Sequence, residues 1–363
     1  MKSSNKQYGK RLLILAFPII MNNIIAQLQM IIDRIFLGHA NDLYMSALGN
    51  VSSPVWTTMS FCNSLVMGAS ILISQSVGAK KREDIGEYAG AMLKYNNIIP
   101  IFLCFFWMIF PKPVFMILGV SDNVMPLCLG YVRWYAPLFL LTGLGGSLGV
   151  ILQTSNYTKP LVVYGCVRSG LNIFLDWMLI FGNLGMPALG IEGAAIATVL
   201  AQIIAFVICW IYMIKRYELL RLSGDDFKEP QPQMIQSMLS AGLSMGFMSS
   251  LINIGSLTLQ TAINKLGQNI IVAHTAARKI TEIFMIMFSV FGQTMATYCG
   301  QNLGAGRIDR IKKGIGLAIL YTCIWCSFTI VASYTIGDWL IYLVTGSNNE
   351  NVIRNAVNYL KFD

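Results

Sequence analysis

The sequence predicts an all-α membrane protein that crosses the bilayer many times. Of its 363 residues, 55% are hydrophobic and only 12% are charged, whereas a soluble protein carries about 25% charged residues. The apolar residues gather in runs of about twenty or more, the length at which a helix spans the hydrocarbon core. These runs are continuous rather than alternating, which excludes a transmembrane β-barrel.

The apolar runs predict the order of the helices. We expect membrane spans over approximately 12–36, 46–74, 88–110, 126–150, 160–182, 191–214, 234–263, 270–300 and 312–335, with another beginning near 351. The longest polar break divides these spans into two groups. The predicted domains are therefore an N-lobe with six helices, a cytoplasmic inter-lobe loop, and a partial C-lobe with helices seven to nine and the start of a tenth, over residues 1–215, 216–233 and 234–363.

The basic residues are distributed unevenly between the loops. The formal net charge of +9 could by itself suggest a nucleic-acid partner. The basic residues instead concentrate in alternate loops, with Lys80, Lys81 and Arg82 after the second span and Arg307 and Arg310 after the eighth. This is the positive-inside pattern, so we expect a cytoplasmic N-terminus, a lipid bilayer as the surroundings and no nucleic-acid partner.

The two halves of the chain repeat each other. The segment Gln75-Ser-Val-Gly-Ala79 follows the second span, and Gln301-Asn-Leu-Gly-Ala305 follows the eighth, 226 residues later. We expect Gln75 and Gln301 to cap helix ends rather than to bind a ligand. Parallel repeats of six spans are a transporter architecture. At this spacing the second repeat is incomplete at Asp363, so we expect either a fragment or a truncated product.

The fifth predicted span carries three polar residues on one face. Arg168, Asn172 and Asp176 are spaced at i, i+4 and i+8 in an otherwise apolar stretch. An ionisable group at this depth costs at least about 2.5–3.5 kcal/mol, so it usually indicates an ion or substrate pathway. The alternatives are a structural hydrogen bond between helices for Asp176 and an interhelical salt bridge for Arg168.

The first predicted span has a matching polar stripe, formed by Asn22, Gln29 and Asp33. At about 1.5 Å per residue from the cytoplasmic ends, Asp33 and Asp176 both fall in the outer half of the membrane. Two carboxyl groups at a similar depth can share a proton or hold Na⁺. We therefore predict a cation site at these two residues, and candidate substrate-cavity residues at Asn22, Gln29 and Arg168.

The eighth predicted span contains one acid, Glu282, four residues after Arg278. An ion pair within the helix is the simpler interpretation of this spacing. Contact between Glu282 and a substrate in the cavity is the alternative, because an acid near the middle of the membrane needs a partner.

The sequence predicts no enzyme and no cofactor or metal beyond a coupling ion. A G-x-x-x-x-G-K-[ST] phosphate loop does not occur, which disfavours ATP-driven pumping. Cys323-Ile-Trp-Cys326 is a lone pair of cysteines in an apolar run. The thiolate that redox or metal chemistry requires is disfavoured there, so packing is the expected role.

The chain resembles the multidrug and toxic compound extrusion (MATE) family over nearly its whole length. The motifs that carry the resemblance are Asp33-Arg-Ile-Phe-Leu-Gly38, Gln75-Ser-Val-Gly-Ala-Lys80, Asn172-Ile-Phe-Leu-Asp176, Leu189-Gly-Ile-Glu-Gly-Ala-Ala-Ile-Ala-Thr198 and Gln301-Asn-Leu-Gly-Ala-Gly306. Members of this family are two-lobed proteins of twelve helices that exchange H⁺ or Na⁺ for organic cations. The resemblance therefore implies a 6+6 helix pseudo-repeat, with the second repeat incomplete here.

The resemblance also implies a site and a mechanism. It implies that Asp33, Asn172, Asp176 and Thr198 form a cation-coupling site in the N-lobe. Some branches carry an acid in the seventh helix, but residues 242–253 contain none, which favours coupling in the N-lobe as in the bacterial DinF-like and MepA-like branch. We accordingly expect a monomeric antiporter in the bacterial cytoplasmic membrane that exchanges H⁺ or Na⁺ for cationic drugs.

Two other functions remain open at this point. One is a lipid-linked oligosaccharide flippase of the same superfamily, which would need several cationic residues to hold a pyrophosphate group. Only Arg133, Arg168 and Arg278 qualify for that role. The other is a membrane protein that does not transport, which the incomplete second repeat would suggest.

Overall fold

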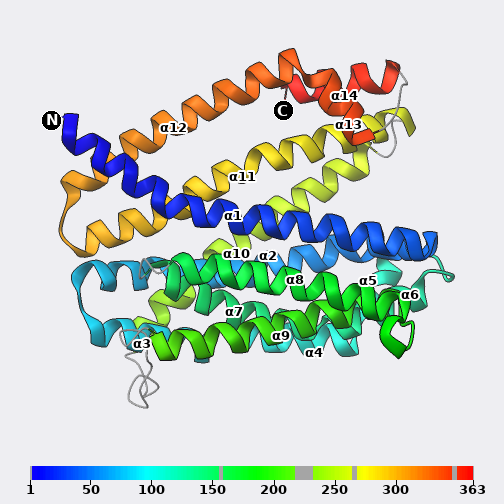
Figure 1. The fold of residues 1–363 in the computed structure, drawn as a ribbon, viewed down its shortest axis with the longest axis horizontal. Helices are drawn as coiled ribbons and strands as arrows, with labels where there is room; N and C mark the ends of the chain where they lie inside the picture. The colour runs from blue at the N-terminus through cyan, green and yellow to red at the C-terminus, as the bar shows by residue number, and fades with distance from the viewer. Residues whose placement is uncertain (1, 155–157, 217–231, 264–267, 346–349, 363) are drawn as a thin grey trace. The chain divides into compact units, whose positions relative to one another are not determined.

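The computed structural model describes residues 2–154, 158–216, 232–263, 268–345 and 350–362, which contain helices and short connections and no β-strand (Figure 1). Each predicted span coincides with a helix or a pair of helices, so the predicted all-α fold is confirmed. The helices in chain order are α1 (Lys2–Ala40), α2 (Asp42–Ala79), α3 (Arg82–Tyr95), α4 (Ile98–Ile109), α5 (Pro111–Ile117), α6 (Met125–Tyr135), α7 (Pro137–Thr154), α8 (Thr158–Phe181), η1 (Asn183–Gly185), α9 (Gly190–Arg216), α10 (Pro232–Ile263), α11 (Gln268–Gly304), α12 (Ile308–Thr335), α13 (Gly337–Thr345) and α14 (Glu350–Phe362).

Eight helical segments in the described part of the chain are long and apolar enough to cross a membrane. They confirm a multi-pass membrane protein. The fifth predicted span, now α8, is not among the eight. Its polar face, with Arg168, Asn172 and Asp176, lowers its mean hydropathy.

The third and fourth predicted spans are each divided into two helices, which the apolar runs did not predict. Between α3 and α4, Asn96 Nδ2 donates to the Leu65 carbonyl at 3.1 Å and Asn97 Nδ2 donates to the Leu93 carbonyl at 2.8 Å. These buried amides pair with backbone carbonyls, which must have partners away from water. Pro137 begins α7, because proline lacks the N–H that a continuous helix would need.

The described chain divides into two compact units. The first unit consists of Met1–Ile20, Leu251–Cys299 and Arg307–Asp363, and the second of Met21–Ser250 and Gly300–Gly306. The predicted inter-lobe loop, residues 216–233, lies mostly outside the described residues. The division into an N-lobe and a C-lobe therefore stays a prediction. The boundaries of the two compact units differ from the predicted domain boundaries.

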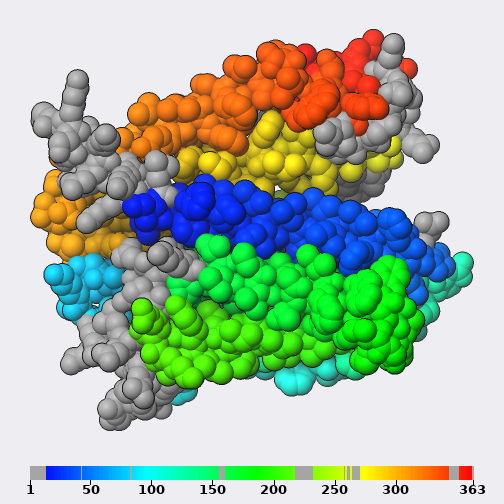
Figure 2. Space-filling model, viewed as in Figure 1, coloured from blue at the N-terminus to red at the C-terminus, as the bar shows by residue number. Residues whose placement is uncertain are grey.

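Helices α2 to α9 form most of the second unit, with two apolar clusters as its core. The first cluster includes the fully buried rings of Phe115 and Phe139, beside Trp107. The second includes Met92 and Met238. Figure 2 shows α8 and α9, both green, packed along each other on the surface of this unit.

The first part of α10 belongs to the second unit because it packs directly on α2. Gly242 of α10 lies so close to Gly68 of α2 that a Cβ at Gly68 would overlap backbone atoms. The hydroxyl groups of Ser64 and Ser249 are hydrogen-bonded at 2.8 Å. This contact explains why the compact unit extends to residue 250, beyond the predicted end of the N-lobe.

The first unit consists of the start of α1, the second half of α10, and α11 to α14. Ala16 and Ile19 of α1 pack on Val290 of α11. At the other end of the unit, the rings of His274 and Tyr359 meet edge to face with their centroids 4.7 Å apart. In Figure 1, α13 and α14 (red) follow the end of α12 (orange).

Candidate functional site

The polar faces of α1 and α8 meet inside the second unit. Asn22 Oδ1 lies directly against Gly165, leaving no room there for a Cβ. Ser169 Oγ donates to Gln29 Oε1 at 2.9 Å, and both side chains are buried. The small residue at position 165 therefore lets α8 approach α1 closely enough for their polar stripes to touch.

Asp33 and Asp176 come together at this contact. Their carboxyl groups lie within hydrogen-bonding reach of each other. Asp176 is 0% exposed, and so is Asn172 one turn before it. The structure thus brings together the two acids that the sequence placed at similar depth on separate helices.

The cluster contains more hydrogen-bond acceptors than donors. Five buried oxygen atoms have no hydrogen-bond donor: Asn22 Oδ1, Asp33 Oδ1, Asn172 Oδ1 and both carboxyl oxygens of Asp176. Buried polar atoms nearly always have partners, and each exception requires an explanation. A set of unpaired carboxyl and amide oxygens has the chemistry that binds a proton or a hard cation.

Thr198 of α9 completes the predicted set. Asn172 Nδ2 lies 3.4 Å from Thr198 Oγ1, with the amide as donor. The Thr198 hydroxyl in turn donates to the Ala194 carbonyl at 2.9 Å. This chain of contacts holds the Asn172 amide nitrogen toward α9, so its unpaired oxygen faces away from Thr198.

Arg168 does not form the interhelical salt bridge that was the alternative to a place in the substrate cavity. In the described residues no carboxylate oxygen lies within 4.0 Å of it, and its buried Nε has no hydrogen-bond partner. Its charge is nevertheless close enough to act on Asp33 and on Tyr135. The guanidinium is therefore a positive charge beside the acids rather than an ion-pair partner of one of them.

Two tyrosines that the sequence analysis did not select border the cluster. Tyr131 and Tyr135 of α6 stack with their ring centroids 5.3 Å apart and an angle of 19° between the rings. Both rings lie within range of the charge of Asp33, and Tyr131 also of Asp176. Their i, i+4 spacing in an apolar span was visible in the sequence, but nothing there connected that span with α1 and α8.

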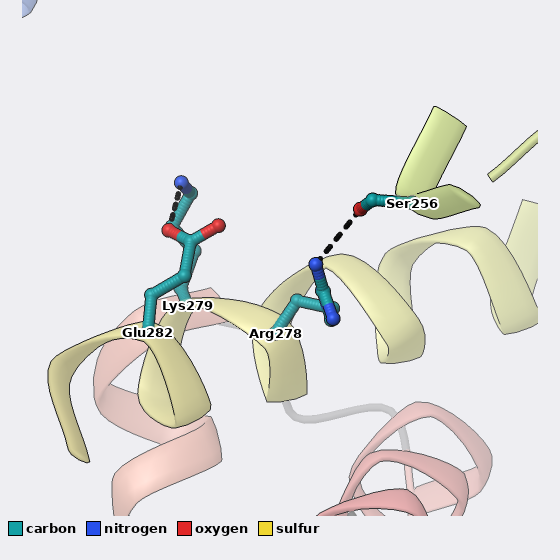
Figure 3. A network of polar contacts seen from close by, with 4 residues as sticks. All are labelled: Ser256, Arg278, Lys279 and Glu282. Atoms are coloured by element: carbon teal, nitrogen blue, oxygen red, sulfur yellow. Dashed lines mark hydrogen bonds and ion pairs between the residues drawn. The ribbon is translucent and has the colours of Figure 1, made fainter. Parts of the chain in front are cut away.

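Glu282 belongs to the first unit and has a different environment. It does not pair with Arg278 as predicted, but with Lys279 at 2.7 Å, and more than 40% of each side chain is exposed. Arg278 points the other way and donates to Ser256 Oγ at 2.9 Å (Figure 3). The i+3 pair forms instead of the i+4 pair because Arg278 finds its partner on α10.

The described residues contain no group of three or more His, Cys, Asp and Glu side chains arranged to hold a metal ion. Cys323 and Cys326 are free thiols on α12. The candidate site therefore consists of two acids with neutral amides and hydroxyls, and the charges of Arg168 and Arg34 act on it, all in the second unit.

A comparison with known families identifies the chain. The MatE family model matches residues 18–178 and 244–362. The chain belongs to the MATE family. This places it among membrane transporters that extrude multiple drugs and toxic compounds, and not among enzymes. The matched residues include both acids and both Gln-x-x-Gly-Ala segments.

Individual MATE relatives agree with this assignment at low identity. The chain is 24% identical to the probable multidrug resistance protein YoeA of Bacillus subtilis, covering 94% of this chain and 72% of the relative. It is 26% identical to the probable multidrug resistance protein NorM of Thermotoga maritima, covering 88% and 69%. A multidrug resistance MATE transporter solved in an outward-facing conformation superposes with a TM-score of 0.85 at 19% identity, covering 98% of this chain and 78% of that one. That likeness concerns the fold.

Proposed function

We propose that this MATE transporter exports organic cations in exchange for H⁺ or Na⁺. The observation that carries the proposal is the cluster of five buried, unpaired oxygens around Asp33 and Asp176. In this proposal the cluster is the binding site of the coupling ion. The two relatives named above are probable multidrug resistance proteins, which supports small organic molecules as substrates.

The residues fit a monovalent cation. Asp33, Asn172 and Asp176 would supply carboxyl and amide oxygens, the ligands that hard cations prefer. A bound H⁺ would be shared between the two carboxyl groups, whereas Na⁺ would draw on the amide oxygen as well. In either case the ion reduces the repulsion between two acids that lie in contact.

The charges of the cluster suggest why binding of the ion and of the substrate would alternate. Asp33 and Asp176 repel each other when both are ionised, and the charges of Arg168 and Arg34 both act on Asp33. A monovalent cation held between the two acids reduces their repulsion. A second cation at the same place would be repelled by the first, so the coupling ion and a cationic substrate compete for one place.

Exchange follows if the site opens to one side of the membrane at a time. On the outer side the coupling ion binds and the organic cation leaves, and on the inner side the order is reversed. The tyrosine pair at Tyr131 and Tyr135 offers π-faces to an organic cation near the acids. We place this exchanger in the bacterial cytoplasmic membrane as a monomer, with its N-terminus in the cytoplasm.

The test is Asp33→Asn with Glu282→Gln as the matched acid-to-amide control. Everted membrane vesicles that contain each protein are loaded with a proton or a sodium gradient, and uptake of the organic cation ethidium is followed. We expect gradient-driven uptake in the parent and in Glu282→Gln, and none in Asp33→Asn. Parental uptake by Asp33→Asn would disprove the proposal.

A further inference from the structure

The C-terminal ends of α2 and α11, which carry the repeated Gln-x-x-Gly-Ala segments, pack against each other within the second unit. A Cβ at Gly78 would overlap the backbone carbonyl of Gln301, and a Cβ at Gly304 would overlap that of Gln75. The contact is therefore reciprocal. The glycine of each segment lies on the backbone of the glutamine that begins the other segment.

The two helix ends also finish in the same backbone conformation. Lys80 and Gly306 both have a left-handed φ, 58° and 68°, and each lies five residues after the glutamine of its segment. The Lys80 N–H donates to the Val77 carbonyl at 3.2 Å, and the Gly306 N–H donates to the Leu303 carbonyl at 2.9 Å. A lysine rarely adopts this φ, so its occurrence at the repeat-related position indicates that the fold requires the turn at both ends.

Gln301 adds a side-chain link to this contact. Its Nε2 donates to the Thr154 carbonyl at the end of α7, at 2.6 Å. Gln301 therefore caps a helix end, that of α7, as predicted. The prediction for Gln75 stays a prediction, because the cap of α2 is the backbone N–H of Lys80. The end of α11, from the second repeat, is thus bound to two helices of the first repeat.

We propose that residues 75–80 and 301–306 form a glycine clamp that closes one side of the transporter and releases when that side opens. The inference rests on the proposed function, since it assumes that the site opens to the two sides of the membrane in turn. α2 and α11 belong to different repeats, so joining their ends closes the passage between the repeats there. The basic residues that follow both segments place this end in the cytoplasm in the proposed orientation.

Glycines suit such a clamp for a physical reason. Backbone surfaces that meet without side chains can separate and pack again without moving interlocked side chains, as in close helix pairs with small residues in membranes. A Cβ at Gly78 or Gly304 would collide with backbone atoms, which cannot shift as the end of a flexible side chain can. Elsewhere on the same two helices, Gly49 of α2 and Gly292 of α11 have open space around the Cβ position.

The experiment measures exposure of a reporter beneath the clamp. Thr154 is 0% exposed, and among the described residues its hydroxyl bonds only to carbonyls of its own helix, so Thr154→Cys is a mild change. The reporter is placed in a chain whose eight native cysteines are replaced by alanine. A membrane-impermeant maleimide is applied to the cytoplasmic face of everted vesicles, and the labelling rate is compared for Gly78→Ala, Gly304→Ala, Gly49→Ala and Gly292→Ala.

We expect the reporter to be shielded in the parent and in Gly49→Ala and Gly292→Ala. Gly78→Ala and Gly304→Ala should each raise the labelling rate about fivefold or more, because overpacking a tight contact shifts an equilibrium by at least this factor. The two increases should be similar, since the contact is reciprocal. Equal labelling in parent and variants, or rapid labelling in the parent itself, would overturn the clamp.

A second variant keeps the test decisive if an alanine variant does not accumulate in the membrane. Gln301→Ala introduces no overlap and removes only the link to the Thr154 carbonyl, so a smaller increase in labelling is expected, and none would count against the clamp. The assay needs neither a substrate nor an ion gradient. A failure of Asp33→Asn to abolish uptake would therefore reject the proposed coupling site while leaving the labelling result to decide the clamp.

Discussion

Two acidic positions on apolar helices, Asp176 of α8 and Glu282 of α11, are equally conspicuous in the sequence and differ completely in the structure. Asp176 is fully buried, and neither of its carboxyl oxygens accepts a hydrogen bond from a donor. Glu282 is more than half exposed and pairs with Lys279 at 2.7 Å. The carboxyl group of Asp176 is thus left without a hydrogen-bond donor, whereas that of Glu282 has a partner on its own helix.

The difference teaches that an acid in a membrane helix is informative when its neighbours fail to neutralise it. A cation three residues away on an exposed helix face forms an ordinary surface pair, usually worth about 0–1 kcal/mol. An acid that faces another acid, with only acceptors around it, costs stability unless something else binds. A buried acid without a hydrogen-bond donor in a membrane helix therefore usually belongs to a functional site.

The comparison predicts its largest effect at Asp176. Asp176→Asn should weaken binding of the coupling ion by about 100-fold, at the upper end of what loss of a supporting group costs an ion site. Asp176→Leu should abolish coupling as well, yet leave the protein equally or more stable, because it removes a buried carboxyl group that has no hydrogen-bond donor and lies against a second acid. Gradient-driven ethidium uptake and the Tm of purified protein in detergent measure the two effects. A marked fall in Tm for Asp176→Leu would mean that the carboxyl group is a structural partner instead.

An intermediate effect is expected where α1 and α8 approach each other. Gly165→Ala should displace the Asn22 amide, because the added methyl group overlaps Asn22 Oδ1. Since this atom is the end of a flexible side chain, the loss of stability should stay near the lower end of the cost of overpacking, about 1 kcal/mol. Gly170→Ala, on the same helix with nothing near the Cβ position, is the control and should leave the Tm unchanged or slightly raised. The comparison of the two Tm values, with uptake by each variant, isolates the contact. Equal behaviour of both variants would mean that the close approach is unimportant.

The smallest effect is expected in the first unit. Glu282→Gln removes an exposed i, i+3 pair, so stability should change by about 0–1 kcal/mol and ethidium uptake should remain close to that of the parent. Lys279→Gln should behave in the same way. A loss of uptake in Glu282→Gln alone would place Glu282 in the substrate path, contrary to the contrast drawn here.

Much of the fold followed from the sequence because the bilayer restricts what a chain can do. Every apolar run became helical, since a backbone in lipid must satisfy its own hydrogen bonds. The breaks at Asn96 and Ala136 did not follow from hydropathy. The break at Asn96 depends on a partner on another helix, the Leu65 carbonyl that the Asn96 amide reaches. The break at Ala136 follows from Pro137, whose missing N–H hydropathy does not register.

The candidate site was predictable in part. The i, i+4, i+8 spacing on α8 and the stripe on α1 indicated which side chains share a face, and the family motifs added Thr198. The spacing could not indicate that Tyr131 and Tyr135 border the acids, because they lie on a third helix whose position depends on packing. Nor could it indicate that Arg168 remains without an ion-pair partner, since that depends on the distances between helices.

The sequence by itself determined the class of protein, the order of its helices, the repeat and the residues with unusual chemistry for a membrane. These follow from composition, period and spacing, which are properties of the chain alone. Only the tertiary structure decided which polar groups meet and which remain unsatisfied. The Gln-x-x-Gly-Ala segments illustrate the division, because their repetition was visible in the chain while their reciprocal contact was not. Contacts between residues more than two hundred positions apart arise from packing, and no local pattern encodes them.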